Sequence, residues 1–195
     1  MPNWCNNKMT IRHSDPAMIR RAAAAWNQHK FLSEFIPVPY ELTLIGGARI
    51  DITKITNMDH HRELEAEIRR INLKHFGHED WYSFCCANWG TKWDIGSDGN
   101  DVEKIDGDSF TVNFVSAWAP PTTAYDTLAS MGFEISAYYY EPGMAFCGRW
   151  EGGIDESFEV PSTIDKVKKA IPADIDAEMF ITETMEDWES EYEAR

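Results

Sequence analysis

The stretch FEISAYYYEPGMAFCGRW, from Phe133 to Trp150, carries the clearest structural signal in this 195-residue sequence. Both halves are rich in aromatic residues, which favour strands, and the second half alternates large apolar side chains with smaller or polar ones. Glu141-Pro142-Gly143 lies between the halves and is typical of a turn. The pattern predicts two antiparallel strands, 133–140 and 144–150, joined as a hairpin.

Two further strands are predicted upstream of the hairpin, at residues 8–12 and 110–116, where apolar and polar side chains alternate. Helices are predicted where apolar side chains recur at helical spacing: from Pro16 onward, over 59–76 and over 122–131. This order approximates a split βαβ unit with helices on one face of an antiparallel sheet. We therefore expect an α+β fold of the ferredoxin-like kind, with an added hairpin strand.

Two segments are harder to interpret. Residues 31–56 contain two prolines and a glycine pair, which interrupt regular elements, so we expect an irregular excursion there. Residues 81–94 are dense in aromatic side chains, and we predict a short strand followed by a packed loop.

The sequence changes character after Pro161. Residues 151–195 hold 14 acidic and 4 basic side chains, within a chain whose formal net charge is −15. A short helix with three lysines is expected after Ser162-Thr163, and one acidic amphipathic helix over 174–192. We divide the chain into an α+β domain, an insertion within it and an acidic helical C-terminal extension; these span residues 1–160, about 31–80, and 161–195.

Composition indicates a globular protein, because 43% of the residues are hydrophobic and 13% are aromatic. The start MPNWCNNKMT has neither a charged n-region nor an apolar core, and no apolar run approaches the roughly 20 residues that span a bilayer. The four cysteines lack CxxC spacing. We expect a soluble, reduced, cytoplasmic protein that is not associated with a membrane.

Catalytic signatures are absent from the sequence. No GxxxxGK[ST], GxGxxG or GxSxG motif occurs. His75 and His78 precede Cys85-Cys86, but the spacing is not that of a zinc site, so we interpret His75 as a core residue and the cysteines as packing residues on a strand. We therefore expect no catalytic residue, no metal and no cofactor, which favours a protein that is not an enzyme.

Four aromatic-rich blocks resemble the YubB-like family of phage and conjugative-plasmid proteins, over most of residues 1–160. The blocks are Pro2 to Asn7, Ala87 to Asp94, Ala117-Trp118 with Pro120-Pro121, and Tyr138 to Trp150. The resemblance implies a ferredoxin-like domain, a mobile-element origin and the cytoplasm of a bacterial host. It implies no catalytic residue and no iron–sulfur cluster.

Polar residues and one tryptophan within these blocks are candidates for lining a pocket: Asn6, Asn88, Trp89, Lys92, Asp94, Glu141 and Arg149. The alternative is structural. Side chains of this kind satisfy loop backbones, and Lys92, Asp94, Glu141 and Arg149 could pair with one another.

The acidic extension supplies a second candidate surface, for binding a partner: Glu183, Glu186, Asp187, Trp188, Glu189, Glu191 and Tyr192. Carboxylates along a helix present a charge array like that of a nucleic-acid backbone, which attracts basic DNA-binding grooves. The alternative is an ordinary solvated helix face.

Our leading hypothesis is a non-enzymatic phage or plasmid accessory protein that binds a host protein through its acidic surface. A defence or nucleic-acid-processing factor is the candidate partner, and the chain would act as an anti-defence inhibitor or DNA mimic. The first alternative is a small-ligand-binding or enzymatic module with a pocket near 88–94 and 141–150. The second is single-stranded nucleic-acid binding by sheet aromatics, although the net charge disfavours direct nucleic-acid binding.

Overall fold

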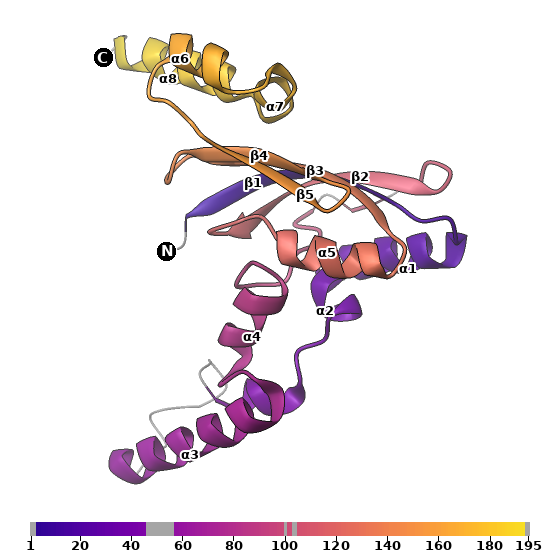
Figure 1. Cartoon of the computed structure of the whole chain (residues 1–195), viewed down its shortest axis with the longest axis vertical. Helices are drawn as coiled ribbons and strands as arrows, with labels where there is room; N and C mark the ends of the chain where they lie inside the picture. Colours follow the sequence, from indigo (N-terminus) through magenta and orange to yellow (C-terminus); the bar gives the residue numbers. More distant parts are fainter. Residues whose placement is uncertain (1–2, 46–56, 100, 103–104, 194–195) are drawn as a thin grey trace.

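The structure is a computed structural model that describes residues 3–45, 57–99, 101–102 and 105–193, without the side chains of 191–193. A five-stranded antiparallel sheet with the strand order β2-β1-β3-β4-β5 forms its centre (Figure 1). The strands are β1 (Trp4–Arg12), β2 (Ser109–Ala117), β3 (Glu134–Glu141), β4 (Phe146–Glu151) and β5 (Ile154–Glu159). The helical elements are α1 (Pro16–Asn27), α2 (Phe31–Phe35), the 3₁₀ helix η1 (Tyr40–Leu44), α3 (Met58–Phe76), α4 (Trp81–Asn88), α5 (Thr122–Ser130), α6 (Ile164–Ala170), α7 (Ala173–Met179) and α8 (Ile181–Glu193).

The predicted split βαβ unit is formed by β2, α5 and β3. Both strands pair antiparallel with β1, so they run parallel to each other with β1 between them. The predicted hairpin is β3–β4, in which Tyr139 lies opposite Gly148, and β5 adds an outer strand. The ferredoxin-like α+β fold is therefore confirmed. Between α1 and β2, the described residues form helices and no strand.

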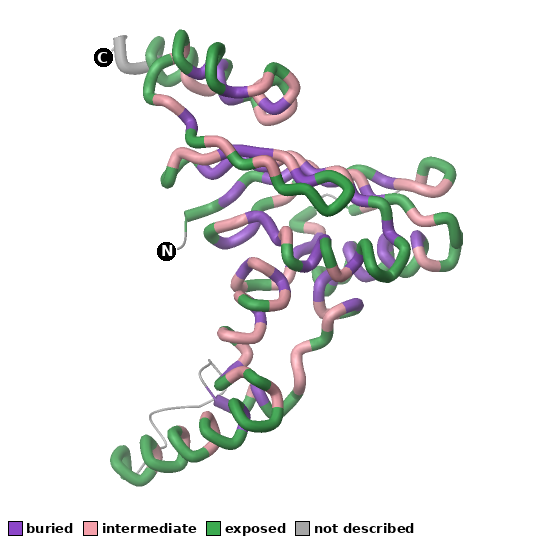
Figure 2. Tube along the Cα trace, viewed as in Figure 1, coloured by how far each residue is buried: buried purple, intermediate pink, exposed green. Residues whose placement is uncertain are grey.

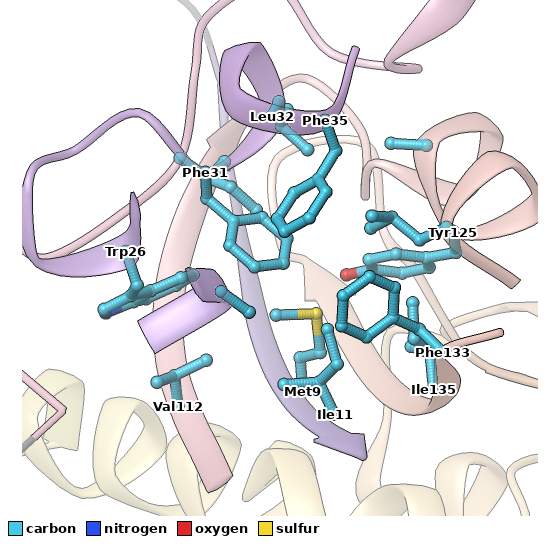
Figure 3. Packing of buried hydrophobic residues seen from close by; sticks show 14 of the residues in the cluster. Met9, Ile11, Trp26, Phe31, Leu32, Phe35, Val112, Tyr125, Phe133 and Ile135 are labelled. Atoms are coloured by element: carbon cyan, nitrogen blue, oxygen red, sulfur yellow. The ribbon is translucent and has the colours of Figure 1, made fainter. Parts of the chain in front are cut away.

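The main core lies between the sheet and helices α1, α2 and α5, which cover one face (Figures 1 and 2). Met9 and Ile11 point into it from alternate positions of β1, and the buried Trp26 ring packs against Phe31 (Figure 3). Asp15 begins α1, because its carboxylate accepts a hydrogen bond from the Ala17 amide. The apolar residues of α1, which recur at helical spacing in the sequence, thus form one face of the helix, and this face packs on the sheet.

Helices α6, α7 and α8 cover the opposite face of the sheet (Figure 1). Ile175 and Ile181 are fully buried there, against a second cluster that includes Cys147 of β4. The single helix predicted over 174–192 is wrong, because Phe180 adopts a left-handed conformation with φ of 54° and separates α7 from α8. Asp176 then accepts hydrogen bonds from the amide and hydroxyl of Thr182 in the first turn of α8.

The predicted strand within 81–94 is also wrong, because residues Trp81–Asn88 form α4. Asp80 and Ser83 make a reciprocal capping box that begins this helix. Arg69 of α3 holds the Asp80 carboxylate at 2.5 Å instead of pairing along its own helix. Cys85 and Cys86 therefore lie on a helix.

Helix α3 extends away from the sheet, and most of its surface is exposed (Figure 2). The apolar side chains Leu64 and Ile71 of this helix are 51% and 44% exposed. His75 is exposed as well, so the interpretation as a core residue is wrong. Residues 46–56, the glycine-rich part of the expected excursion, lie outside the described residues.

Candidate functional site

The acidic candidates Asp94 and Glu141 hold backbone in place. Asp94 accepts hydrogen bonds from the amides of Leu32 and Ser33, at 2.6 and 3.1 Å, and so caps α2. Glu141 is 1% exposed and accepts from the Gly143 and Met144 amides in the β3–β4 turn. Both carboxylates therefore accept hydrogen bonds from backbone amides, Asp94 at the start of a helix and Glu141 in a turn.

Two further candidates also have structural partners. Arg149 contacts Glu156 at 2.5 Å and Asp174 at 2.6 Å, which ties β4 to β5 and to α7. The Trp89 indole is buried and donates a hydrogen bond to the Ile36 carbonyl.

The remaining three candidates lie apart from one another. The Asn88 amide donates to the Phe84 carbonyl within α4. Lys92 lies among aromatic rings, with its ammonium nitrogen 4.6 Å from the Trp93 ring centroid. Asn6 is exposed on β1, on the face towards the C-terminal helices. The structure therefore does not gather the seven residues into one pocket.

An open cavity of about 730 Å³ lies instead between the C-terminal helices and the outward face of β1 and β2. We call it the α8 groove and define it by eight lining residues. They are Asn6, Lys8, Asn113 and Val115 from the sheet, and Met179, Phe180, Met185 and Trp188 from the helices. Only Asn6 and Trp188 among the predicted site residues belong to it.

The groove has an apolar side and a polar side. Phe180 and Trp188 are 60% and 68% exposed, which is unusual for side chains of this size and marks a surface available to a ligand. On the sheet side, Asn6 and Asn113 make no side-chain hydrogen bond to any other described protein group, so their amides can bind a ligand.

The helices on one side of the groove carry an acidic surface, although among the described lining residues only Asp98 and Glu178 are acidic. Residues 173–193 contain nine acidic and no basic side chains. The Lys8 ammonium, on the sheet side, is 2.5 Å from the Glu178 carboxylate and is neutralised by it. Of the predicted partner-binding set, Glu183, Glu186, Asp187 and Glu189 are exposed, whereas Glu191 and Tyr192 have no described side chains. The groove therefore favours a cationic ligand.

Sequence reasoning missed most of the groove. The outward position of Val115 follows from the alternation of β2, in which Phe114 points to the main core. Met179 and Met185 flank the break at Phe180, which the continuous helical pattern concealed. Among the described residues, no three His, Cys, Asp or Glu side chains converge as metal ligands.

The cysteines show how the fold sets thiol reactivity. Burial, aided by Glu141, raises the pKa of Cys5 to about 12, and burial, aided by Cys86 and Asp94, raises that of Cys85 to about 12. Burial, aided by Asp176, raises the pKa of Cys147 to about 11.

We expect one fast-reacting thiol, that of the partly exposed Cys86, when the native protein is treated with an aromatic disulfide reagent at neutral pH. Cys86→Ser should abolish the fast phase, and unfolding should expose all the remaining thiols. Because the folded pKa values are raised, the stability from the protonated thiols is present below pH about 9 and is lost as the pH rises towards 11–12. Two or more fast thiols at neutral pH would contradict the burial.

In the described part of the chain, no helix combines the length and apolar character needed to cross a bilayer. No curated protein matches the sequence. The chain superposes on the crystal structure of a protein api92 from Yersinia pseudotuberculosis with a TM-score of 0.39 and 12% identity, covering 84% of this chain and 99% of that chain.

Residues 88–170 match a family model described as a ferredoxin-like domain in Api92-like protein. The matched segment contains β2, α5, β3, β4, β5 and α6. The match supports the ferredoxin-like domain that the resemblance implied, and it does not test the assignment to the YubB-like family. Residues 88–170 of this chain are thus similar to the ferredoxin-like domain of Api92-like proteins.

Proposed function

We propose that this chain is a non-enzymatic accessory protein of a phage or plasmid that binds a host protein through the α8 groove. The supporting observation is an open apolar groove beside an acidic helical surface. Methionine side chains adapt to different apolar partners, and tryptophan is one of the residue types enriched among the residues that dominate binding energy at interfaces. Met179, Met185 and Trp188 supply both features on one side of the groove.

The ligand that fits best is a basic amphipathic helix of the partner. Its apolar side chains would contact Met185 and Trp188, which line the groove. Its lysines or arginines would extend to Glu183 and Glu186, which lie outside the groove on the surface next to Phe180. A volume of about 730 Å³ is large enough for several side chains of such a helix.

A host defence or nucleic-acid-processing factor in the bacterial cytoplasm is the partner class that we propose. Proteins of this class bind nucleic acid through basic surfaces, and the acidic extension would compete for those surfaces. This is the basis for an anti-defence or DNA-mimic role.

The small-ligand alternative near 88–94 and 141–150 has less support. Asp94, Glu141 and Arg149 already bind backbone amides or opposite charges, so these side chains do not converge on an empty site.

The groove can be tested with a fluorescein-labelled amphipathic peptide of leucine, tryptophan and lysine, and with a scrambled peptide of the same composition. We expect the amphipathic peptide to bind more tightly than the scrambled one. Trp188→Ala should weaken binding at least about tenfold, because truncating an anchor of this type typically costs 2 kcal/mol or more. The measurement is fluorescence anisotropy at low and moderate salt.

Trp93→Ala is the matched control, because Trp93 is an exposed tryptophan that does not line the groove. Capture from host lysate with the same three proteins then identifies a partner that requires Trp188 but tolerates Trp93→Ala. Equal binding of both peptides, or an unchanged affinity in Trp188→Ala, would rule out an apolar anchor in this groove.

A further inference from the structure

A second exposed aromatic surface surrounds Lys92. Trp4 of β1, Tyr82 of α4, Trp93 and Trp118 are each between 39% and 46% exposed. The Lys92 ammonium nitrogen lies 4.6, 5.3 and 5.8 Å from the ring centroids of Trp93, Trp118 and Tyr82. Trp4 and Trp93 are themselves 5.8 Å apart between centroids. We call these five residues the aromatic–lysine patch.

Lys92 forms no ion pair with any of the described residues. Its cation–π contacts use the faces of neighbouring rings but leave N–H donors available to an anion. Acidic residues nearby in sequence are already occupied: Asp80 binds Arg69 and the Ser83 amide, and Asp94 caps α2. The patch is therefore a locally positive, apolar surface on an acidic protein.

One residue of the patch, Trp118, has an unfavourable backbone conformation that neighbouring hydrogen bonds hold in place. Trp118 has φ of 71°, in the left-handed region that a bulky residue rarely adopts. Its amide donates to the Asn3 carbonyl at 2.9 Å. The Thr91 hydroxyl donates to the Ala117 carbonyl at 3.0 Å, immediately before it. Backbone strain of this kind concentrates at functional sites, and here it keeps the Trp118 ring at the surface beside Lys92.

The α4 side of the patch is separated from the acidic extension by the sheet. Helix α4, which carries Tyr82, lies on the side of the sheet opposite α6, α7 and α8 (Figure 1). Repulsion between exposed charges is largely screened beyond the Debye length, which is about 8 Å at physiological ionic strength. The net charge of the whole chain therefore overstates the repulsion that an anion meets at Lys92.

We propose that the aromatic–lysine patch binds single-stranded nucleic acid, with bases stacked on the exposed rings and a phosphate at Lys92. Stacking on aromatic rings tolerates any base, and a lysine recognises phosphate as a point charge. The patch is not part of the α8 groove, so this activity does not depend on the proposed partner.

The patch also relocates the nucleic-acid site expected on the face of the sheet. Tyr139, Tyr140 and Trp150 are buried and cannot stack on bases. Tyr138 packs in the second cluster beneath the C-terminal helices. The exposed rings lie instead at the end of β1 and β2, where Trp4 is paired with Ala117.

The test uses the full chain and a labelled single-stranded DNA of about 12 thymidines, a length within the range covered by single-strand binding domains. We expect anisotropy to report binding that weakens as salt rises. Trp93→Ala should weaken it at least about fivefold, because one stacked base is lost. Lys92→Gln should reduce the slope of log affinity against log salt by about 0.7, the value for one phosphate on a single strand.

Trp188→Ala and Lys168→Gln are the matched controls, since both residues are exposed and lie on the extension. Neither should alter DNA binding, whereas Trp188→Ala should weaken the groove interaction, so the two proposals fail separately. No measurable binding, or equal losses in the patch and control variants, would overturn the site. Equal affinity for duplex DNA would overturn stacking, and tighter binding of an acidic tryptophan-containing peptide would assign the patch to a protein.

Discussion

Gly148→Ala is expected to destabilise the protein by about 3 kcal/mol or more, because the position has no room for a side chain. A Cβ built on Gly148 would collide with the backbone carbonyl oxygen of Glu156 and with the Tyr139 hydroxyl. Tyr139 lies opposite Gly148 in the β3–β4 ladder, and its ring crosses this gap to donate a hydrogen bond to Asp155 at 2.6 Å. Urea unfolding followed by circular dichroism measures the loss.

Tyr139→Phe removes the hydroxyl from this contact but leaves the ring carbon Cζ, which would lie 2.5 Å from a Cβ at position 148. Alone it should cost about 1.5–3 kcal/mol, because the lost hydrogen bond is to a carboxylate. The double variant should remain strongly destabilised, because the Glu156 carbonyl belongs to the neighbouring strand and cannot move without breaking the β4–β5 pairing. If the free energy of unfolding of Gly148→Ala lies within about 1 kcal/mol of that of the parent protein, the close packing of β3, β4 and β5 around this position is incorrect.

Ile175→Asp is expected to release α6, α7 and α8 from the sheet, with a local cost of about 3–5 kcal/mol for an unpaired buried charge. Ile175 is fully buried in the second cluster, between α7 and the outward face of the sheet. Hydrogen exchange should show loss of protection in these three helices while β1 and β2 stay protected. The groove peptide should no longer bind.

Ala177→Asp is a matched control, because it introduces the same side chain at an exposed position of the same helix. It should leave protection and stability within about 0.5 kcal/mol of the parent protein. The reactivity of the Cys147 thiol gives an independent readout, since this thiol should react only when α6, α7 and α8 have separated from the sheet. Uniform loss of protection in Ile175→Asp, across both faces, would show that the extension does not unfold independently of the main core.

The sequence predicted those parts of the fold that the local pattern of apolar and polar side chains determines. The β3–β4 hairpin follows from the pattern around Glu141-Pro142-Gly143, and α1 follows from its apolar spacing and its cap. Helix α4 was missed because Trp81, Tyr82 and Phe84 favour strands, whereas the Asp80–Ser83 capping box decides the outcome. Helix α3 was predicted correctly as a helix, but its apolar side chains do not mark a buried face: Leu64 and Ile71 are exposed in the described part of the structure.

The candidate site depended on contacts that a linear pattern does not contain. Asp94 and Glu141 were chosen as polar residues in aromatic blocks, but the amides that they bind become neighbours only in the folded chain. The α8 groove exists because the chain turns at Phe180, a residue type that rarely adopts positive φ. Two predicted site residues line the groove: Trp188, an aromatic residue among carboxylates, and Asn6, a polar residue in an aromatic block.

The position of β5 at one edge of the sheet has a consequence for self-association. An edge strand offers unpaired amides and carbonyls to any other strand, and natural proteins protect such edges with charged residues. Three of the six residues of β5 are acidic, and two of them, Asp155 and Glu156, are held by Tyr139 and Arg149. A second copy approaching this edge would bring like charges together, so strand addition that leads to fibrils is opposed by the same carboxylates that fasten β5 to its neighbours.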